Sequence, residues 1–166
     1  MTNFDTHESF YHGLIKSKLW LCEELEIVMY SEFIKNPTLH VLGCWDNLMA
    51  FMLLTRKPEF YNAVYGYDIN PEAINTANRV CDMWLYEKPH VYNRVQDVNH
   101  YDYSSHTNSI FINCSIDQMD SNNWYETVPD NSIVCIQTTN MMDPDFPWYI
   151  KQTTENLDEL INKFNF

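Results

Sequence analysis

Residues 63–72 read Ala-Val-Tyr-Gly-Tyr-Asp-Ile-Asn-Pro-Glu, a mainly apolar run that passes directly into a helix start. The run predicts a strand at 63–69, because apolar and aromatic residues fill most of it. Asn70 is a good N-cap, Pro71 pre-sets the first helical turn, and Glu72 complements the helix dipole. A strand that leads at once into a helix is the repeating unit of α/β folds.

The same combination occurs earlier in the chain, where another apolar run precedes a second helix start. Asp46 is the expected N-cap of a buried helix that extends to Leu54. The region 88–108 is polar and weakly periodic; it could hold a short strand at 91–95, and its structure is left open. Three further apolar runs predict strands: 38–43, 109–116 and 132–138. The last two are apolar through most of their length, as strands covered by helices on both faces should be.

Helices are expected at both ends of the chain. Apolar residues from His7 to Ile34 predict one amphipathic helix, or two that break near Gly13, and Asn36-Pro37 ends this segment. A last amphipathic helix is predicted at 156–164. The alternation of strands and helices predicts one α/β domain over 1–166 with a mostly parallel sheet. Its helical N-terminal segment, core and C-terminal helix are expected at 1–36, 38–140 and 141–166.

Composition limits the functions that are expected of the chain. The formal net charge of -13, from 10 Lys+Arg against 23 Asp+Glu, opposes binding to a phosphate backbone, so nucleic acid is not expected as a substrate. The five cysteines form no Cys-x-x-Cys pair and the six histidines show no ligand spacing, so no metal site is predicted. Neither a signal core nor a run long enough to span a bilayer is present, so we expect a cytoplasmic protein without a membrane partner.

A ligand site is expected where the parallel strands end, because α/β sheets bind ligands beyond the carboxyl ends of their strands. Gly43 ends one strand just before a helix, so a ligand could approach the backbone there. Asp68 follows at the tip of the next strand, 68 − 43 = 25 residues later, where an acidic side chain can accept hydrogen bonds from ribose hydroxyls. An alternative role for Asp68 is to cap the following helix, although Asn70 fills that role more naturally.

Two stretches resemble motifs of the class I S-adenosylmethionine (SAM)-dependent methyltransferases. Val41-Leu-Gly-Cys-Trp-Asp-Asn47 is similar to the first motif of that family, and Tyr65-Gly-Tyr-Asp-Ile-Asn-Pro-Glu-Ala-Ile74 is similar to its second strand and acidic tip. Residues 113–119 resemble the stretch that flanks the adenine, and 128–138 resemble the approach to the fourth strand. The resemblance implies a Rossmann-like sheet, SAM as cofactor and a truncated class I architecture. The short chain and its Gly-Cys-Trp motif are similar to those of phage-encoded members of the family.

The resemblance also implies a set of cofactor contacts. Gly43 would lie under the methionine part of SAM, Asp68 would hold the ribose, and Ile69 would touch the adenine. The stretch from Ser115 to Asp117 would close over the base. The complete set of cofactor-binding residues implied at the strand ends is Gly43, Cys44, Trp45, Asp68, Ile69, Asn70, Ser115, Ile116, Asp117 and Gln137.

The sequence departs from the family pattern in ways that leave the catalytic residues unassigned. Trp45 and Asn47 stand where the family has glycine, and the strands expected after the fourth are missing, with the hairpin that helps to build a substrate cap. Tyr11 and His12 are candidates because class I enzymes place a lid on this N-terminal helix. Asn140 is a candidate because it follows the last expected strand, but its surroundings match an Asn-Pro-Pro-Tyr motif only loosely.

Three functions therefore remain open at this point. The first is a SAM-dependent methyltransferase that acts on a small molecule or a protein group. The second is an enzyme that uses SAM differently, by aminocarboxypropyl transfer or as a lyase, and the third is an inactive binding or accessory module. A sheet in the order 3-2-1-4 would leave its fourth strand as an exposed edge, so a homo-oligomer formed through 133–166 is also predicted.

Overall fold

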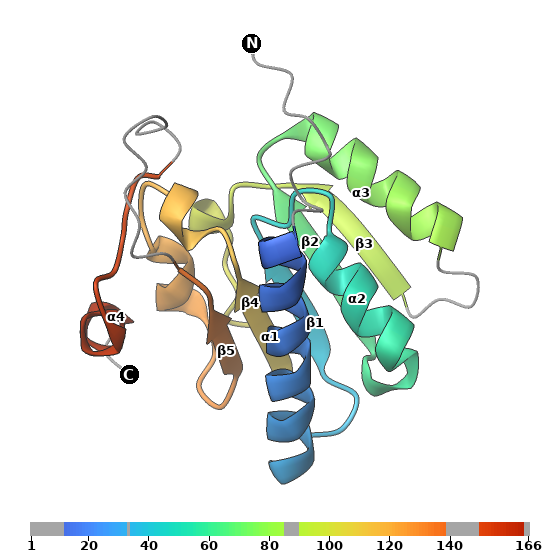
Figure 1. Cartoon of the computed structure of the whole chain (residues 1–166), viewed down its shortest axis with the longest axis horizontal. Coiled ribbons are helices and arrows are strands. Elements are labelled where there is room, and N and C mark those ends of the chain that lie inside the picture. The colour runs from blue at the N-terminus through green and yellow to red at the C-terminus, as the bar shows by residue number, and fades with distance from the viewer. Residues whose placement is uncertain (1–11, 33, 85–89, 139–149, 165–166) are drawn as a thin grey trace.

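The computed structural model describes residues 12–32, 34–84, 90–138 and 150–164, which form a layered α/β structure (Figure 1). The α-helices within these ranges are α1 (His12–Ser31), α2 (Leu48–Arg56), α3 (Pro71–Trp84) and α4 (Leu157–Phe164). The strands are β1 (Thr38–Leu42), β2 (Ala63–Asp68), β3 (His90–Val95), β4 (Ser109–Asn113) and β5 (Ile133–Ile136). Short 3-10 helices are η2 (Pro58–Phe60), η3 (Val98–His100), η4 (Ile116–Gln118) and η5 (Asn123–Thr127).

The five described strands form one parallel sheet with the order β3-β2-β1-β4-β5. This topology confirms the predicted α/β, Rossmann-like fold class. Leu42 at the end of β1 lies opposite both Tyr67 and Asn113, so the tips of β1, β2 and β4 are level. The strand order reverses between β1 and β4, and a crevice opens at such a point.

The prediction of four strands in the order 3-2-1-4 is wrong by one strand. The region left open contains β3, so the run at 132–138 forms the fifth strand and not the fourth. β3 has no continuous apolar run, because it is an edge strand whose side chains are half-buried or exposed. β5 is the outermost described strand on the other side, and self-association through 133–166 stays a prediction.

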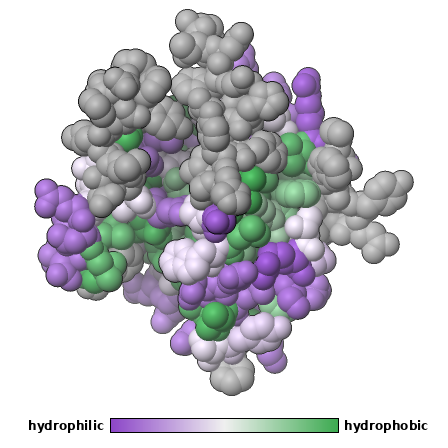
Figure 2. Space-filling view, viewed as in Figure 1, coloured by the Kyte–Doolittle hydropathy of each residue, from purple (hydrophilic) through white to green (hydrophobic). Residues whose placement is uncertain are grey.

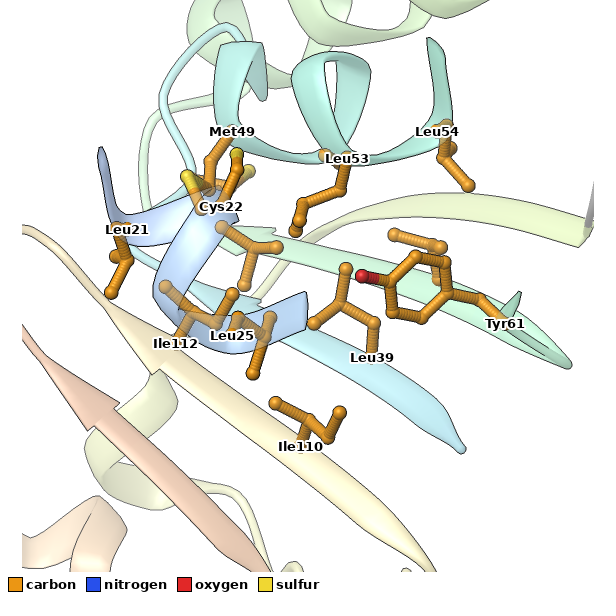
Figure 3. Packing of buried hydrophobic residues seen from close by; sticks show 14 of the residues in the cluster. Leu21, Cys22, Leu25, Leu39, Met49, Leu53, Leu54, Tyr61, Ile110 and Ile112 are labelled. Carbon is orange, nitrogen blue, oxygen red and sulfur yellow. The ribbon is translucent and has the colours of Figure 1, made fainter. Parts of the chain in front are cut away.

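One face of the sheet packs against α1, α2 and α3 through aliphatic side chains. Figure 3 shows Leu25 of α1 and Leu53 of α2 in one cluster with Leu39 of β1 and the isoleucines of β4, Ile110 and Ile112. All five are at most 2% exposed. These residues form the core that holds the helices against the sheet, because apolar burial is the main favourable contribution to folding.

The opposite face packs through aromatic side chains that alternate with the aliphatic ones along the strands. Tyr67 of β2 and Phe111 of β4 point to this face. Tyr103 from the loop after β3, Trp124 of η5 and Phe164 of α4 complete the cluster, and the first four of these rings are fully buried. The structure covers this face mainly with 3-10 helices and loops, whereas α-helices cover the other face.

Helix α1 is continuous from His12 to Ser31, so no break occurs at Gly13 within the described residues. The helix is less amphipathic than expected, because Trp20, Ile27 and Tyr30 are 58, 61 and 63% exposed. Figure 2 shows hydrophilic and hydrophobic residues mixed on the side of the molecule where α1 lies. None of the helices in the described ranges is long and apolar enough to cross a membrane.

Candidate functional site

The turn between β1 and α2 has a left-handed backbone at every second residue. The φ angles of Gly43, Trp45 and Asn47 are 61°, 53° and 55°. The family that the sequence resembles has glycine at these three positions, and glycine adopts this region of φ without strain. Asparagine tolerates this region of φ, whereas the left-handed backbone raises the conformational energy of a residue such as tryptophan by about 1 to 2 kcal/mol.

Gly43 is required at its position by space as well as by conformation. A Cβ atom added to it would lie 2.8 Å from the Cβ of Ser115, which is too close. The Ser115 hydroxyl also donates a 2.9 Å hydrogen bond to the Gly43 carbonyl, so the tips of β1 and β4 are joined here. The predicted N-cap of α2, Asp46, is wrong by one residue: Asn47 is the N-cap, and the Asp46 carboxylate accepts a bond from the Leu48 amide.

Asp68 at the tip of β2 ties three segments together. Its Oδ2 accepts a 3.0 Å hydrogen bond from the Trp45 amide, and its Oδ1 accepts a 2.9 Å bond from the Asn70 amide. The Asn70 side chain in turn accepts from the Glu72 amide and so caps the start of α3. A carboxylate offers about four acceptor positions, so Asp68 keeps capacity for further donors such as hydroxyls.

A pocket of about 270 Å³ opens where these tips meet. Six predicted cofactor residues line it: Gly43, Trp45, Asp68, Ile69, Asn70 and Ser115. The other four do not. Cys44 is buried in the aliphatic core and Ile116 in the aromatic cluster, because neighbouring residues of a turn point in different directions. Asp117 uses its carbonyl to bind the Lys151 amide, and the Gln137 amide donates to Asn113 at the end of β4.

Sequence reasoning missed the part of the pocket that follows β3. Gln96, Asp97, Val98 and Asn99 line it, and the Gln96 amide donates a 2.8 Å hydrogen bond to the Asp68 carbonyl. The signal was the suggested strand at 91–95, since the tip of a strand beside β2 must lie next to Asp68. Asp97 is held in place by the Asn99 amide and by the His100 ring, 2.8 Å from its Oδ2.

The segment that begins at residue 150 closes the pocket on the β4 side. The Lys151 amide donates a 2.6 Å bond to the Asp117 carbonyl, and the Gln152 side chain donates to the carbonyls of Ile116 and Met119. The Lys151 ammonium lies 2.7 Å from the Asp120 carboxylate, and both residues line the pocket with Gln118 and Met119. No local sequence pattern predicts these contacts, because they join residues more than thirty positions apart.

The pocket carries a net negative charge among its described lining residues. The described lining contains three carboxylates, those of Asp68, Asp97 and Asp120, and one ammonium group, that of Lys151. Burial raises the pKa of the nearby Asp117 carboxyl above its ordinary value. Among the described residues, no group of three His, Cys, Asp or Glu side chains could hold a metal ion.

The three catalytic candidates are not tested by this geometry. Tyr11 and Asn140 lie outside the described residues, and His12 is the first residue of α1, with a side chain outside the described part of the chain. The described lining of the pocket contains no histidine or tyrosine. The catalytic group therefore stays unassigned.

Comparison with known proteins links this geometry to one fold. No protein-family model matches the sequence, and no curated protein matches it. The YcgJ protein of Bacillus subtilis superposes with a TM-score of 0.63 at 11% identity, covering 86% of this chain and 66% of that one. A SAM-dependent methyltransferase of Clostridium acetobutylicum gives 0.63 at 10% identity, covering 85% and 60%. The plantazolicin methyltransferase BpumL, in complex with S-adenosylhomocysteine (SAH), gives 0.60 at 14% identity, covering 89% and 56%.

These superpositions establish the fold of the chain. It is the fold of the class I SAM-dependent methyltransferases, as the sequence resemblance implied. The chain spans 56 to 66% of the lengths of these three structures.

Proposed function

We propose that the chain binds SAM in the pocket at the strand tips and is a methyltransferase that acts on a small molecule or a protein group. The observation that carries the proposal is the left-handed turn at Gly43, Trp45 and Asn47, anchored on the Asp68 carboxylate. Gly43 lines the pocket, and a residue without a side chain lets a ligand approach the backbone closely. The fold, which is that of the class I SAM-dependent methyltransferases, also supports SAM as the ligand.

The residues of the pocket suit the three parts of SAM. The Asp68 carboxylate accepts the ribose hydroxyls, and the backbone at Gly43 borders the methionine chain. The adenine then lies towards the tip of β3, beside Ile69 and Asp97, because β3 is the neighbour of β2 in the sheet. This placement revises the expectation that 115–117 cover the base: β4 lies on the other side of β1.

Bound SAM would supply a methyl group on a positively charged sulfur: the acceptor nucleophile would bond to the methyl carbon, the carbon–sulfur bond would break, and SAH would leave. The contribution of the chain to such a displacement is alignment of the nucleophile with the methyl group, and positioning can lower a barrier by several kcal/mol. The rigid turn at Gly43, fixed to both β2 and β4 by hydrogen bonds, suits this role.

Calorimetric titration with SAM and SAH tests the proposal, with Asp68→Ala as the decisive variant. Loss of hydrogen bonds to a charged acceptor should weaken binding by about 1.5 to 3 kcal/mol, or about ten- to a hundredfold. Asp130→Ala is the matched control, because this aspartate is exposed in the turn before β5 and does not line the pocket. Equal affinity of Asp68→Ala and the parent chain would show that the site is misplaced.

Product analysis separates methyl transfer from the alternatives. Methyl transfer converts SAM to SAH, whereas aminocarboxypropyl transfer or a lyase reaction leaves methylthioadenosine. An inactive binding module leaves SAM intact. The strained Trp45 in the first motif is the feature that keeps non-methyl chemistry worth testing. Incubation with SAM, followed by chromatography of the nucleosides, distinguishes the three outcomes once a panel of acceptors is supplied.

A further inference from the structure

We propose that Trp45 forms the wall of the pocket that faces the sulfonium, so that the site binds charged SAM more tightly than neutral SAH. The inference rests on the proposed function and assigns a role to a residue that the family pattern leaves unexplained. Trp45 lines the pocket with Gly43 and Asp68, and it does so from a left-handed backbone with φ of 53°.

The strained backbone is the first argument for a role in binding. A left-handed tryptophan costs about 1 to 2 kcal/mol that glycine would not cost. Strain of this kind is held where the surrounding structure enforces it, and it concentrates at ligand sites. The enforcing contacts are present here: the Cys44 amide donates to the Tyr67 carbonyl at 2.8 Å, and the Asn47 amide donates to the Cys44 carbonyl at 2.7 Å.

The position of Trp45 relative to Asp68 is the second argument. The Trp45 amide lies 3.0 Å from the Asp68 oxygen, so its side chain starts beside the acceptor of the ribose. In SAM the adenine is attached at one end of the ribose and the sulfur at the other, through the 5′ carbon. With the adenine towards β3, the sulfur would lie on the side of the β1 turn, where Trp45 lines the pocket. An aromatic face attracts a cation that lies within about 6 Å of the ring centre.

The charge of the pocket is the third argument, and it acts in the same direction. Lys151, the cation of the described lining, is engaged by Asp120, and the Asp97 carboxylate contacts the His100 ring. The hydrogen-bond donors to the Asp68 carboxylate are backbone amides, so it keeps its full negative charge towards the pocket. Carboxylates attract a cation over a long range, and salt screens this attraction. An aromatic face attracts a cation only at contact distance, where screening by salt is weak. A tryptophan face adds selectivity that persists at high salt.

The experiment compares the SAM to SAH affinity ratio by calorimetry in the parent chain, Trp45→Leu and Trp45→Phe. Leucine keeps an apolar bulk but has no ring, and phenylalanine keeps a smaller ring. We expect Trp45→Leu to weaken SAM binding about 3- to 20-fold and to change SAH binding less than about twofold, with Trp45→Phe in between. Trp20→Leu is the control, because it removes an indole that is 58% exposed on α1 and leaves the pocket intact.

Repeating the titrations in about 0.5 M NaCl separates the ring from the carboxylates, since the Debye length then falls to a few ångström. The inference holds if the parent chain keeps its preference for SAM at high salt and Trp45→Leu loses it. It is overturned if the parent chain binds SAM and SAH equally, if salt abolishes its preference, or if Trp45→Leu weakens both ligands alike. A parent chain that binds neither ligand would instead overturn the proposed function itself.

Discussion

On one face of the sheet, α1, α2 and α3 bury leucine, isoleucine, valine, methionine and cysteine; on the other, loops and 3-10 helices cover a stack of rings. Both faces draw on the same strands, because successive side chains point in opposite directions. Leu39 and Val41 therefore pack under the helices, while His40 between them faces the rings.

The rings form a row across four strands at one register. The ring centroids of Phe111 in β4 and His40 in β1 are 4.6 Å apart. The centroid distance from His40 to Tyr65 in β2 is 5.4 Å, and that from Tyr65 to Tyr92 in β3 is 5.2 Å. The Arg94 guanidinium lies over the Tyr65 ring at 4.9 Å. Each ring thus meets its cross-strand partner directly, in the way that stabilises neighbouring strands.

The stability of the two faces therefore depends on different interactions. The helical face depends on filled volume, so it should respond to lost side-chain atoms and not to pH. The aromatic face contains a buried imidazole, so it should respond to protonation as well as to the loss of rings. The following changes test this contrast.

The largest effect is expected on the helical face, from Leu53→Ala in α2. Leu53 is 1% exposed, and truncation of a buried leucine removes apolar contacts and leaves a cavity. The free energy of unfolding, measured with urea at neutral pH, should fall by about 3 to 5 kcal/mol. Leu157→Ala is the control, because Leu157 is 68% exposed, and it should change stability by less than about 0.5 kcal/mol.

An intermediate effect is expected on the aromatic face when the pH falls. Burial, and then the charges of His106 and Arg94, lower the pKa of His40 from 6.5 to about 3. Between these values the unfolded chain binds a proton at His40 and the folded chain does not. Stability is therefore complete above about pH 6.5 and declines below it, by about 2 to 3 kcal/mol at about pH 4.5.

His40→Gln isolates this contribution, because glutamine does not titrate. Carboxylates change stability with pH in both proteins, so the loss from about pH 7 to about pH 4.5 should be smaller in His40→Gln by the same 2 to 3 kcal/mol. Urea unfolding at the two pH values provides the comparison. Parallel losses in the two proteins would mean that the folded chain accommodates a protonated His40.

The smallest effect is expected at the end of the ring row, from Tyr92→Ala. Tyr92 is 43% exposed and contacts Tyr65 on one side, so its removal should cost about 1 kcal/mol in urea unfolding. Tyr92→Phe keeps the ring and should stay within about 0.3 kcal/mol of the parent. A loss in Tyr92→Phe as large as that in Tyr92→Ala would attribute the stability to the hydroxyl and not to stacking.

The candidate site could be predicted where a strand leads directly into a turn. Gly43 and Asp68 stand at the ends of apolar runs, so their place at the sheet's edge followed from the sequence, and both line the pocket. Asp97 and Lys151 were missed for physical reasons. Asp97 follows a polar edge strand without an apolar signal. Lys151 is held at the pocket by contacts with Asp117 and Asp120, which lie more than thirty positions earlier in the chain.

The alternation of strands and helices, the parallel sheet and the acidic tip of β2 could all be predicted from the sequence, because local propensity and hydrophobic pattern depend on neighbouring residues. Three outcomes became visible only in the folded chain: β3 completes the sheet, Cys44 and Ile116 turn into the core, and Trp45 adopts a left-handed backbone that is typical of glycine. Such outcomes depend on hydrogen bonds and packing between segments far apart in the chain, which no local pattern encodes.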